Sequence, residues 1–399
     1  MLMNLRISHD ELRKRRRTVV EELGQRKLDA LVLFKPPSIF YLTNFAYVTT
    51  ERPIALVLSS RNELVVFLPR LEQEHAEETA LIDRVEMYEE YPGLRPPMAI
   101  FAEVLKEMGL GKARIGVESD GYGRISGYEG LALSEVMPDA IMSNHANLVE
   151  YLRHCKSPEE IALIKESARW SNLAHRLLQT KVRAGSLEME ISISASQEAS
   201  TAMIQTLGDG YEPRSWVMMG ATTGFRGQIG PNSAFPHAFM KNLKLRKGDN
   251  LVTYARTFVW GYNSELERTM FVGEPSVEQK KYFDLVCRLQ NTALEAIKPG
   301  RPCCEVDRAA RAFYEDHGLT KYWRHHVGHS LGLEIHEAPY LDIGNDWVMK
   351  PGMVFSVEPG IFVPGLGGFR HSDTVLVTES GIEMLTYYPR DLESLICSD

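Results

Sequence analysis

The second half of the chain repeats one succession of features, and this repetition constrains the fold more than any other property of the sequence. Each copy begins with a capped helix, at Ser157-Pro158 with Glu160 and at Ser276 with Gln279. In each copy a glycine then precedes a glutamate by five positions, and a second glycine later precedes an apolar strand; the glycines are Gly185, Gly248, Gly300 and Gly352. Two copies about 105–115 residues apart predict an internal duplication with two similar halves.

The first 150 residues have a different organisation, in which strand and helix patterns alternate. Short apolar runs predict strands over 28–34, 53–59, 63–68 and 114–118. The sequence Ser-Arg-Asn predicts a hairpin between the second and third strands, and a helix is expected over 99–108. The pattern predicts a small α/β domain with a mixed sheet. We place the domains at residues 1–154 and 155–399.

Charge and cysteine content exclude several classes of protein. There are 45 Lys and Arg against 53 Asp and Glu, a net charge of −8, which argues against nucleic acid or an anionic membrane as partner. No run of 18 apolar residues occurs, and the charged N-terminal segment does not have the pattern of a signal peptide. Five irregularly spaced cysteines form no disulfide framework. We therefore expect a cytoplasmic protein.

Histidine, glutamate and aromatic residues are concentrated in four segments of the second half, 229–239, 248–269, 325–337 and 352–373. These segments carry ordered motifs: Gly248-Asp249, Gly261-Tyr262, Arg268-Thr269, Gly328-His329, His336-Glu337 and Glu358-Pro359-Gly360. Together the motifs resemble those of the pita-bread superfamily of methionine and proline aminopeptidases and creatinase. The resemblance covers the whole chain and implies an α/β fold, with a small N-terminal domain followed by a pseudo-twofold catalytic domain.

Metallopeptidases of this superfamily hold two divalent ions with two Asp, one His and two Glu, and the sequence departs from that set. The resemblance retains His329 and Glu358, but Tyr254 and Glu265 stand where the Asp residues would be, and Ser372 where the last Glu would be. Two neighbouring ions need several anionic oxygens to offset their repulsion. At best one ion would be held weakly, so we expect no metal and no cofactor.

The residues that differ from the metallopeptidases resemble those of creatinase, a metal-free member of the superfamily that hydrolyses creatine at its guanidinium carbon. Its Glu-Arg-Thr motif matches residues 267–269, and its active-site His and Glu match His237 and Glu358. An Arg-Pro in its small domain matches Arg52-Pro53. In creatinase that arginine reaches the substrate carboxylate across a dimer interface, so the resemblance implies a homodimer with Arg52 contributed in trans.

These groups together suit a small zwitterion with an amidine-like cation. Glu267 and Glu358 can accept N–H bonds from a planar amidinium. His237 can take a proton from attacking water and return it to the leaving nitrogen, and Arg52 can hold a carboxylate by a bidentate pair. In a variant mechanism Glu265 or Glu267 is the nucleophile of a covalent intermediate.

Ectoine, a cyclic amidine with a carboxylate, fits this description, and the whole sequence resembles the ectoine hydrolases more closely than creatinase. We expect water to open the ring at a C–N bond that is not a peptide bond, giving N-acetyl-2,4-diaminobutyrate, with a downstream deacetylase as a candidate partner. The expected catalytic residues are His237, Glu267, Glu358 and Glu265. The expected substrate contacts are Arg52, His329, His336, Tyr254, Trp260 and Arg370, with Phe235 and Trp216 as further apolar walls.

Three alternatives stay open. One is creatinase or a related guanidino-acid amidinohydrolase. Another is an Xaa-Pro peptidase-like enzyme with a reduced metal site. The last is an inactive relative that only binds a peptide or protein partner.

Overall fold

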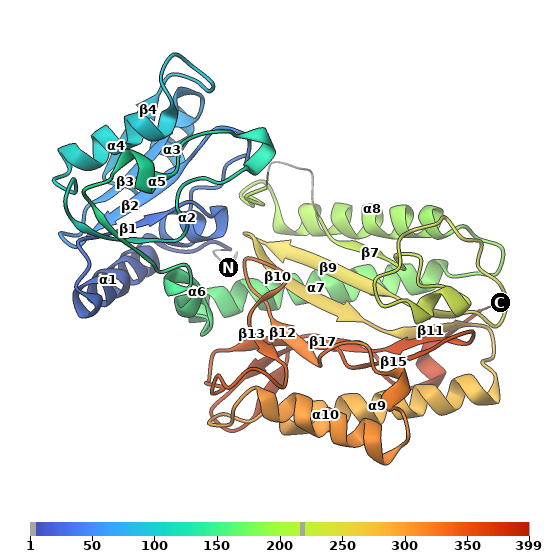
Figure 1. Ribbon diagram of the computed structural model, residues 1–399. Coiled ribbons are helices and arrows are strands. Elements are labelled where there is room, and N and C mark those ends of the chain that lie inside the picture. The colour runs from blue at the N-terminus through green and yellow to red at the C-terminus, as the bar shows by residue number, and fades with distance from the viewer. Residues whose placement is uncertain (1–4, 216–219, 399) are drawn as a thin grey trace. The chain divides into compact units, whose positions relative to one another are not determined.

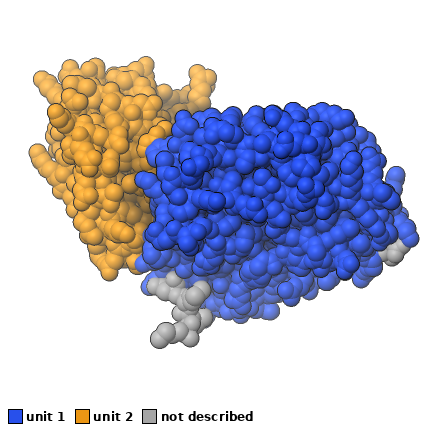
Figure 2. Space-filling view, turned by 90° about the horizontal axis from the view of Figure 1, so that it is seen from below, with its two compact units in different colours: residues 1–6, 154–213, 217–399 blue, residues 7–153, 214–216 orange. Residues whose placement is uncertain are grey.

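The computed structural model describes residues 5–215 and 220–398, and the chain divides into two compact units (Figure 2). The N-terminal unit comprises residues 7–153 and 214–216. The C-terminal unit comprises residues 1–6, 154–213 and 217–399. No helix in the described ranges has both the length and the apolar character needed to cross a membrane.

The N-terminal unit is built on a mixed six-stranded sheet in the order β4-β3-β2-β1-β5-β6. Its strands are β1 (Ala30–Leu33), β2 (Ala55–Ser59), β3 (Leu64–Pro69), β4 (Arg84–Tyr88), β5 (Arg114–Val117) and β6 (Ile141–Asn144). Its helices are α1 (His9–Arg26), α2 (Pro36–Thr43), α3 (Gln73–Thr79), α4 (Pro97–Glu107), α5 (Leu133–Val136) and α6 (Leu148–Arg153). Strands β1–β2 and β2–β3 pair antiparallel and the other neighbours pair parallel, so the predicted hairpin and mixed sheet are confirmed.

The four predicted strands of this unit correspond to β1, β2, β3 and β5, and the predicted helix to α4. Strands β4 and β6 were not predicted. Their residues are mostly half-buried or exposed and their sequences, RVEMY and IMSN, contain no continuous apolar run. Tertiary pairing at the two edges of the sheet forms these strands, and periodicity alone does not reveal such pairing.

The C-terminal unit begins each of its halves with a capped helix, as the repeated pattern predicts. Helix α7 (Pro158–Lys181) has a capping box in which the Ser157 side chain accepts from the Glu160 N–H. Helix α9 (Val277–Ala296) has the same box between Ser276 and Gln279. Helix α8 (Glu188–Leu207) follows α7, and α10 (Cys304–Asp316) follows α9. Both predicted caps are therefore confirmed, and each satisfies helix N–H groups that would otherwise lack acceptors.

One curved sheet joins the two halves, in the order β13-β12-β14-β17-β10-β9-β7, with β18 paired to β17. Its strands are β7 (Thr222–Gly224), β9 (Tyr254–Val259), β10 (Tyr262–Glu267), β12 (Gly328–Ser330), β13 (Glu337–Leu341), β14 (Val354–Val357), β17 (Ser372–Val377) and β18 (Ile382–Met384). Smaller sheets combine β8 (Asn250–Val252), β11 (Thr269–Val272) and β19 (Ile396–Cys397), and β15 (Gly360–Val363) with β16 (Gly367–Arg370).

The helix pairs cover different halves of this sheet (Figure 1). Helices α7 and α8 pack on β7, β9 and β10, whereas α9 and α10 pack on β14 and β13. The halves meet where β10 pairs antiparallel with β17, through Leu266 opposite Asp373 and Glu267 opposite Ser372. The expected fold, a small α/β domain followed by a pseudo-twofold domain, is confirmed.

Candidate functional site

The β10–β17 junction has two faces, because successive side chains of a strand point to opposite sides. Glu267 faces Ser372 across the junction, whereas Leu266 faces Asp373 on the other side. The register of the neighbouring strands adds further polar side chains to the side of Glu267: Glu265, Ser356 and His329. We call this side the cluster face and the side of Asp373 the network face.

Three groups of the cluster face converge on one point. The His329 Nε2 atom lies 3.3 Å from a Glu358 oxygen and 3.7 Å from a Glu265 oxygen. One donor atom from each of the three side chains lies within 4.8 Å of the others. They come from β10, β12 and the residue after β14, so both halves of the unit contribute.

The protonation of this triad follows from its contacts. Burial alone would lower the pKa of His329, but contact with Glu358 and the charge of Glu265 raise it to about 9. Burial alone would raise the pKa of Glu358, but contact with His329 and the charge of Arg370 lower it. His329 is therefore an imidazolium at neutral pH as long as only these carboxylates surround it.

A fully buried carboxylate lies beside the triad and is shared by two arginines. Glu267 pairs with Arg370, whose Nε lies 2.5 Å from Oε2 and whose Nη2 lies 2.9 Å from Oε1. Arg226 also pairs with Glu267 Oε1. Burial raises the pKa of Glu267, and the two guanidinium charges oppose that rise. Arg370 is also 3.9 Å from Glu358, so it links Glu267 to the triad.

Arg226 was missed by the sequence analysis. It lies in the turn after β7 with φ of 52°, a left-handed conformation that costs a non-glycine residue about 1–2 kcal/mol. Its guanidinium lies 4.9 Å from the centre of the Tyr254 ring. Strained backbone of this kind concentrates at functional sites. The only sequence feature at this position is the tetrapeptide Gly-Phe-Arg-Gly, which precedes the histidine-containing segment 229–239. This tetrapeptide is not one of the superfamily motifs.

Two histidines mark the exposed edge of the cluster. The His336 ring contacts the His329 ring at a tilt of 43°, with ring centres 4.0 Å apart. Burial and the charge of His329 lower the pKa of His336, and His237 contributes in the same direction. His237 is exposed in the loop after the short helix η3 (Gly230–Ala234). His336 therefore contacts the triad on its exposed side, and His237 lies within electrostatic reach of His336.

The support for the other predicted contacts differs from residue to residue. Trp260 is 3 % exposed and lies in the β9–β10 turn, whereas Tyr254 and Glu267 lie at the far end of that hairpin. Its position gives no support to a role as a wall of this cluster. Phe235 is 63 % exposed, and Trp216 lies outside the described residues. Arg52 belongs to the N-terminal unit, where it pairs with Glu90 at 2.6 Å and Glu51 at 2.5 Å.

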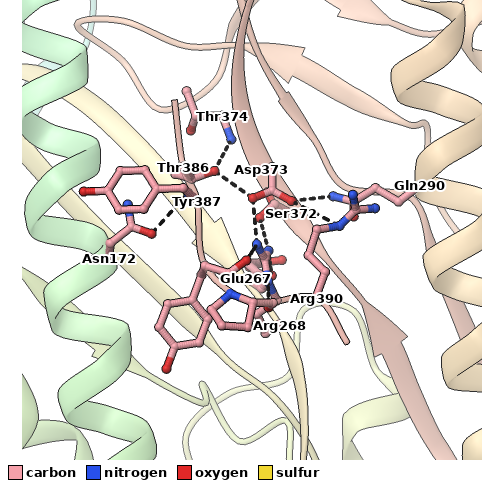
Figure 3. A network of polar contacts seen from close by, with 12 residues as sticks. Asn172, Glu267, Arg268, Gln290, Ser372, Asp373, Thr374, Thr386, Tyr387 and Arg390 are labelled. Atoms are coloured by element: carbon pink, nitrogen blue, oxygen red, sulfur yellow. Dashed lines mark hydrogen bonds and ion pairs between the residues drawn. The ribbon is translucent and has the colours of Figure 1, made fainter. Parts of the chain in front are cut away.

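The network face holds a second set of charges (Figure 3). Arg268 is fully buried and its Nη2 lies 2.8 Å from Asp373 Oδ1. Its other N–H groups donate to the carbonyl oxygens of Glu267, Ser372, Tyr388 and Pro389, at 2.7–2.9 Å. Asp373 also accepts from Thr386 and Gln290. Arg268 thus fixes the backbone of both strands from which Glu267 and Ser372 project.

The donor set fits one divalent ion better than two. Carboxylate oxygen and imidazole nitrogen are both ligand types that zinc accepts, and catalytic zinc sites commonly have three protein ligands. The Nε2 atom of His329 is buried and makes no regular hydrogen bond within the described part of the chain. A second ion does not fit, because Tyr254 and Ser372 are neutral, and Ser372 Oγ is 2.8 Å from Ser356 Oγ. The Arg370 guanidinium, close to Glu267 and Glu358, would also repel it.

Comparison with known proteins gives consistent matches along the whole chain. Residues 162–379 match the model of metallopeptidase family M24, and residues 15–155 match the creatinase/prolidase N-terminal domain. An Xaa-Pro dipeptidase from Pyrococcus horikoshii is 27 % identical over 397 residues, covering 96 % of this chain and 99 % of that protein.

Solved structures give the same result. The Xaa-Pro dipeptidase from Bacillus anthracis has a TM-score of 0.79 at 29 % identity, covering 98 % of this chain and 100 % of that chain. A dipeptidase from Mycobacterium ulcerans has a TM-score of 0.81 at 26 % identity, covering 99 % and 100 %.

These relatives correct the expected reaction. We expected hydrolysis of a non-peptide C–N bond in a cyclic amidine, and that expectation is wrong, because the similar proteins are dipeptidases. The relatives give no support to ectoine as the substrate or to a deacetylase as a partner. The comparisons favour the alternative of an Xaa-Pro peptidase-like enzyme over creatinase.

Proposed function

Because the chain belongs to metallopeptidase family M24, we propose that it is a hydrolase of the Xaa-Pro dipeptidase type that cleaves the amide C–N bond of a small substrate. We further propose that it works with a reduced metal site, one divalent ion held by Glu265, His329 and Glu358. The observation that carries this proposal is the convergence of these three donors within 4.8 Å.

Two of the three ligands have support from their neighbours. Ser356 Oγ donates to Glu265 Oε2 at 3.0 Å, and Nδ1 of His329 is 3.1 Å from the Ser330 carbonyl oxygen. Such partners orient metal ligands and fix the imidazole tautomer. When bound, a divalent ion at this site would polarise the substrate carbonyl and lower the pKa of an attached water. His329 must lose its proton to act as a ligand, so ion binding releases that proton.

The remaining groups have separate tasks in this proposal. Arg370 helps keep Glu358 ionised and holds Glu267 in a fixed position. His237 is accessible at the exposed edge, and we assign to it the proton that the leaving nitrogen needs. The His336 ring, whose pKa is lowered by burial, contacts the His329 ring from the exposed side.

The test is an assay on Gly-Pro and Ala-Pro after exhaustive chelation and then with added zinc, manganese or cobalt. We expect activity to disappear with chelator and return with about one ion per chain, measured by elemental analysis. Glu265→Gln should lose both the ion and the activity. Glu383→Gln is the matched control, because Glu383 is an exposed glutamate paired with Lys165. Activity that survives chelation, or two tightly bound ions, would contradict the reduced site.

A further inference from the structure

We propose that the buried ion pair of Lys156 and Glu337 positions two histidine rings of the cluster face, His329 and His336. Both rings belong to the segment that leaves β12 and enters β13, residues 329–337, which we call the histidine loop. The two ions are positioning residues, because each acts on the cluster through this loop. The inference rests on the proposed function, since His329 is one of the proposed ligands of the ion.

The ammonium group of Lys156 holds the two ends of the histidine loop together. Its Nζ atom lies 3.1 Å from Ser330 Oγ and 3.4 Å from Glu337 Oε2, and the Lys156 and Glu337 side chains are 1 % and 2 % exposed. Ser330 directly follows His329, and Glu337 directly follows His336. Ser330 and Glu337 also stand opposite each other in the pairing of β12 with β13. One cation therefore binds the two residues that follow the two histidines.

Lys156 is itself held by elements outside the loop. Its N–H donates to the Gly352 carbonyl oxygen at 2.8 Å, in the turn before β14. The next residue, Ser157, caps the first turn of α7. The ion pair therefore ties the histidine loop to α7 and to the start of β14, two elements that are ordered independently of the loop.

The main chain of the loop packs closely around the pair. A Cβ atom at Gly332 would lie 3.0 Å from both carboxylate oxygens of Glu337 and 3.2 Å from Lys156 Cε. The Glu334 N–H donates to Glu337 Oε1 at 2.9 Å. On β10, the N–H and Nδ2 of Asn263 donate to the Gly332 carbonyl oxygen at 2.8 Å and 2.9 Å. The loop is thus fixed both by the ion pair and by the strand that carries one of the proposed ligands.

The ring of His329 depends on this support because strand pairing is irregular at its position. The register between β12 and β13 shifts between His329 and Ser330, and such irregularities change the direction of side chains. Nδ1 of His329 lies 3.1 Å from the Ser330 carbonyl oxygen, so the ring follows the position of Ser330. His336 precedes Glu337, and its ring contacts that of His329. Fixing Ser330 and Glu337 therefore fixes both rings.

The energetics of burial favour positioning over stability as the role of the pair. Taking two charges out of water is costly, and apolar side chains of similar volume often stabilise a fold equally well. An ammonium, however, donates in up to three directions and can hold a hydroxyl and a carboxylate at once. Apolar side chains at positions 156 and 337 would fill the space without connecting Ser330 to Glu337.

The test separates stability from ion binding with Lys156→Met and with the double variant Lys156→Met/Glu337→Leu. We expect Lys156→Met to lower the thermal unfolding midpoint and to weaken zinc binding to metal-free protein, measured by calorimetry, about 10- to 100-fold. The double variant leaves no unpaired charge, so it should regain most of the midpoint but not the zinc affinity. A double variant that regains both would show that the pair only stabilises the fold and would overturn the proposal.

Arg15→Met is the matched control. Arg15 is also a buried cation, 3 % exposed and 3.3 Å from Glu11, but it belongs to the N-terminal unit, which supplies none of the three proposed ligands. Its loss should lower the unfolding midpoint and leave the zinc affinity unchanged. An equal loss of zinc affinity in Arg15→Met would show that reduced stability alone weakens the site, which would contradict a specific role for Lys156.

Nuclear magnetic resonance of metal-free protein separates this proposal from the proposed function, because it requires neither an ion nor turnover. We expect the Nδ1 proton of His329, assigned with His329→Gln, to give a separate signal in wild type and in Arg15→Met, and to be lost to exchange with water in the double variant. If this occurs while wild type binds no zinc or hydrolyses no dipeptide, the positioning role stands and the proposed function falls. If the double variant keeps the signal, or wild type lacks it, the pair does not hold the ring, whatever the reaction.

Discussion

The two faces of the β10–β17 junction contain the same kinds of charged group but differ in how completely these groups are paired. On the network face, each N–H of Arg268 has an acceptor and Asp373 accepts from three side chains. On the cluster face, His329 Nε2 has only loose contacts with two carboxylates, and Arg226 remains partly exposed. A complete network stabilises the fold, whereas an incomplete one leaves donors and acceptors for a ligand.

The largest effect on activity should come from removing a charge on the cluster face. Glu358→Gln keeps the shape of the side chain but removes the charge that holds His329 and would hold the ion. We expect kcat/KM to fall by about 1,000-fold, or about 4 kcal/mol of transition-state stabilisation. Thermal unfolding should show that the variant stays folded. A variant that keeps more than a tenth of wild-type activity would exclude Glu358 from the site.

Substitutions on the network face should instead lower the free energy of unfolding. Arg268→Met leaves buried Asp373 with only the longer contact to Arg390, at 3.9 Å, which should lower the free energy of unfolding by about 3–5 kcal/mol. Adding Asp373→Leu should restore part of that loss, because no uncompensated charge then remains. Arg288→Met is the control, since Arg288 is 52 % exposed and pairs with Asp284 at 3.7 Å, and its loss should change stability by less than about 0.5 kcal/mol. Equal losses for the two arginines would show that the network is not the support described here.

A third test asks whether a residue from the partner chain completes the cluster face. The homodimer with Arg52 in trans stays a prediction, and in this structure Arg52 pairs with Glu51 and Glu90 of its own unit. Arg52→Ala and His237→Ala should each lower activity by about 10- to 100-fold. Mixing the two variants should restore about a quarter of wild-type activity, because half of the random dimers hold one intact site. If subunits exchange but activity stays low, Arg52 does not act in trans.

The smallest expected effect is a pH dependence of stability that arises from two buried histidines near Arg268. Burial lowers the pKa of His371 and of His175 well below the usual value of about 6.5. Above that value both residues are neutral whether the protein is folded or unfolded. Below it only the unfolded chain gains protons, so stability falls with falling pH by about 1.4 kcal/mol per pH unit for each histidine. His371→Leu should reduce that slope by about one proton in urea unfolding between pH 6 and 4.5. An unchanged slope would show that His371 is protonated in the fold.

Local chemistry made most of the fold predictable. The caps at Ser157 and Ser276 and the hairpin of β2 and β3 depend on short sequence patterns with local hydrogen bonds. Strands β4 and β6 exist only through their neighbours in the sheet, and the sequence does not indicate which strands pair with them. The duplicated pattern was the sequence signal for the two similar halves of the C-terminal unit.

The sequence indicated which residues form the site, but it did not indicate which of their side chains pair with one another. Glu265, Glu267, Glu358, His329 and Arg370 were all named from motifs, and the structure brings them together. The sequence analysis assigned Arg370 to the substrate, whereas the structure pairs it with Glu267. Arg226 was missed because its importance comes from a left-handed turn and a position beside Tyr254. The aromatic Trp260 lay near the motifs in sequence, but the length of the hairpin separates it from the cluster.

The acceptors of Arg268 also determine when the site is finished during synthesis. Two of them, the carbonyl oxygens of Tyr388 and Pro389, lie about 120 residues further along the chain. A nascent chain that has emerged only as far as β17 already contains every side chain of the cluster face. It still lacks two of the carbonyl groups that accept from Arg268, the side chain that bridges the strands of Glu267 and Ser372. The ribosome must therefore deliver residue 389 before the hydrolytic centre becomes rigid, so unfinished chains should show little activity in the cell.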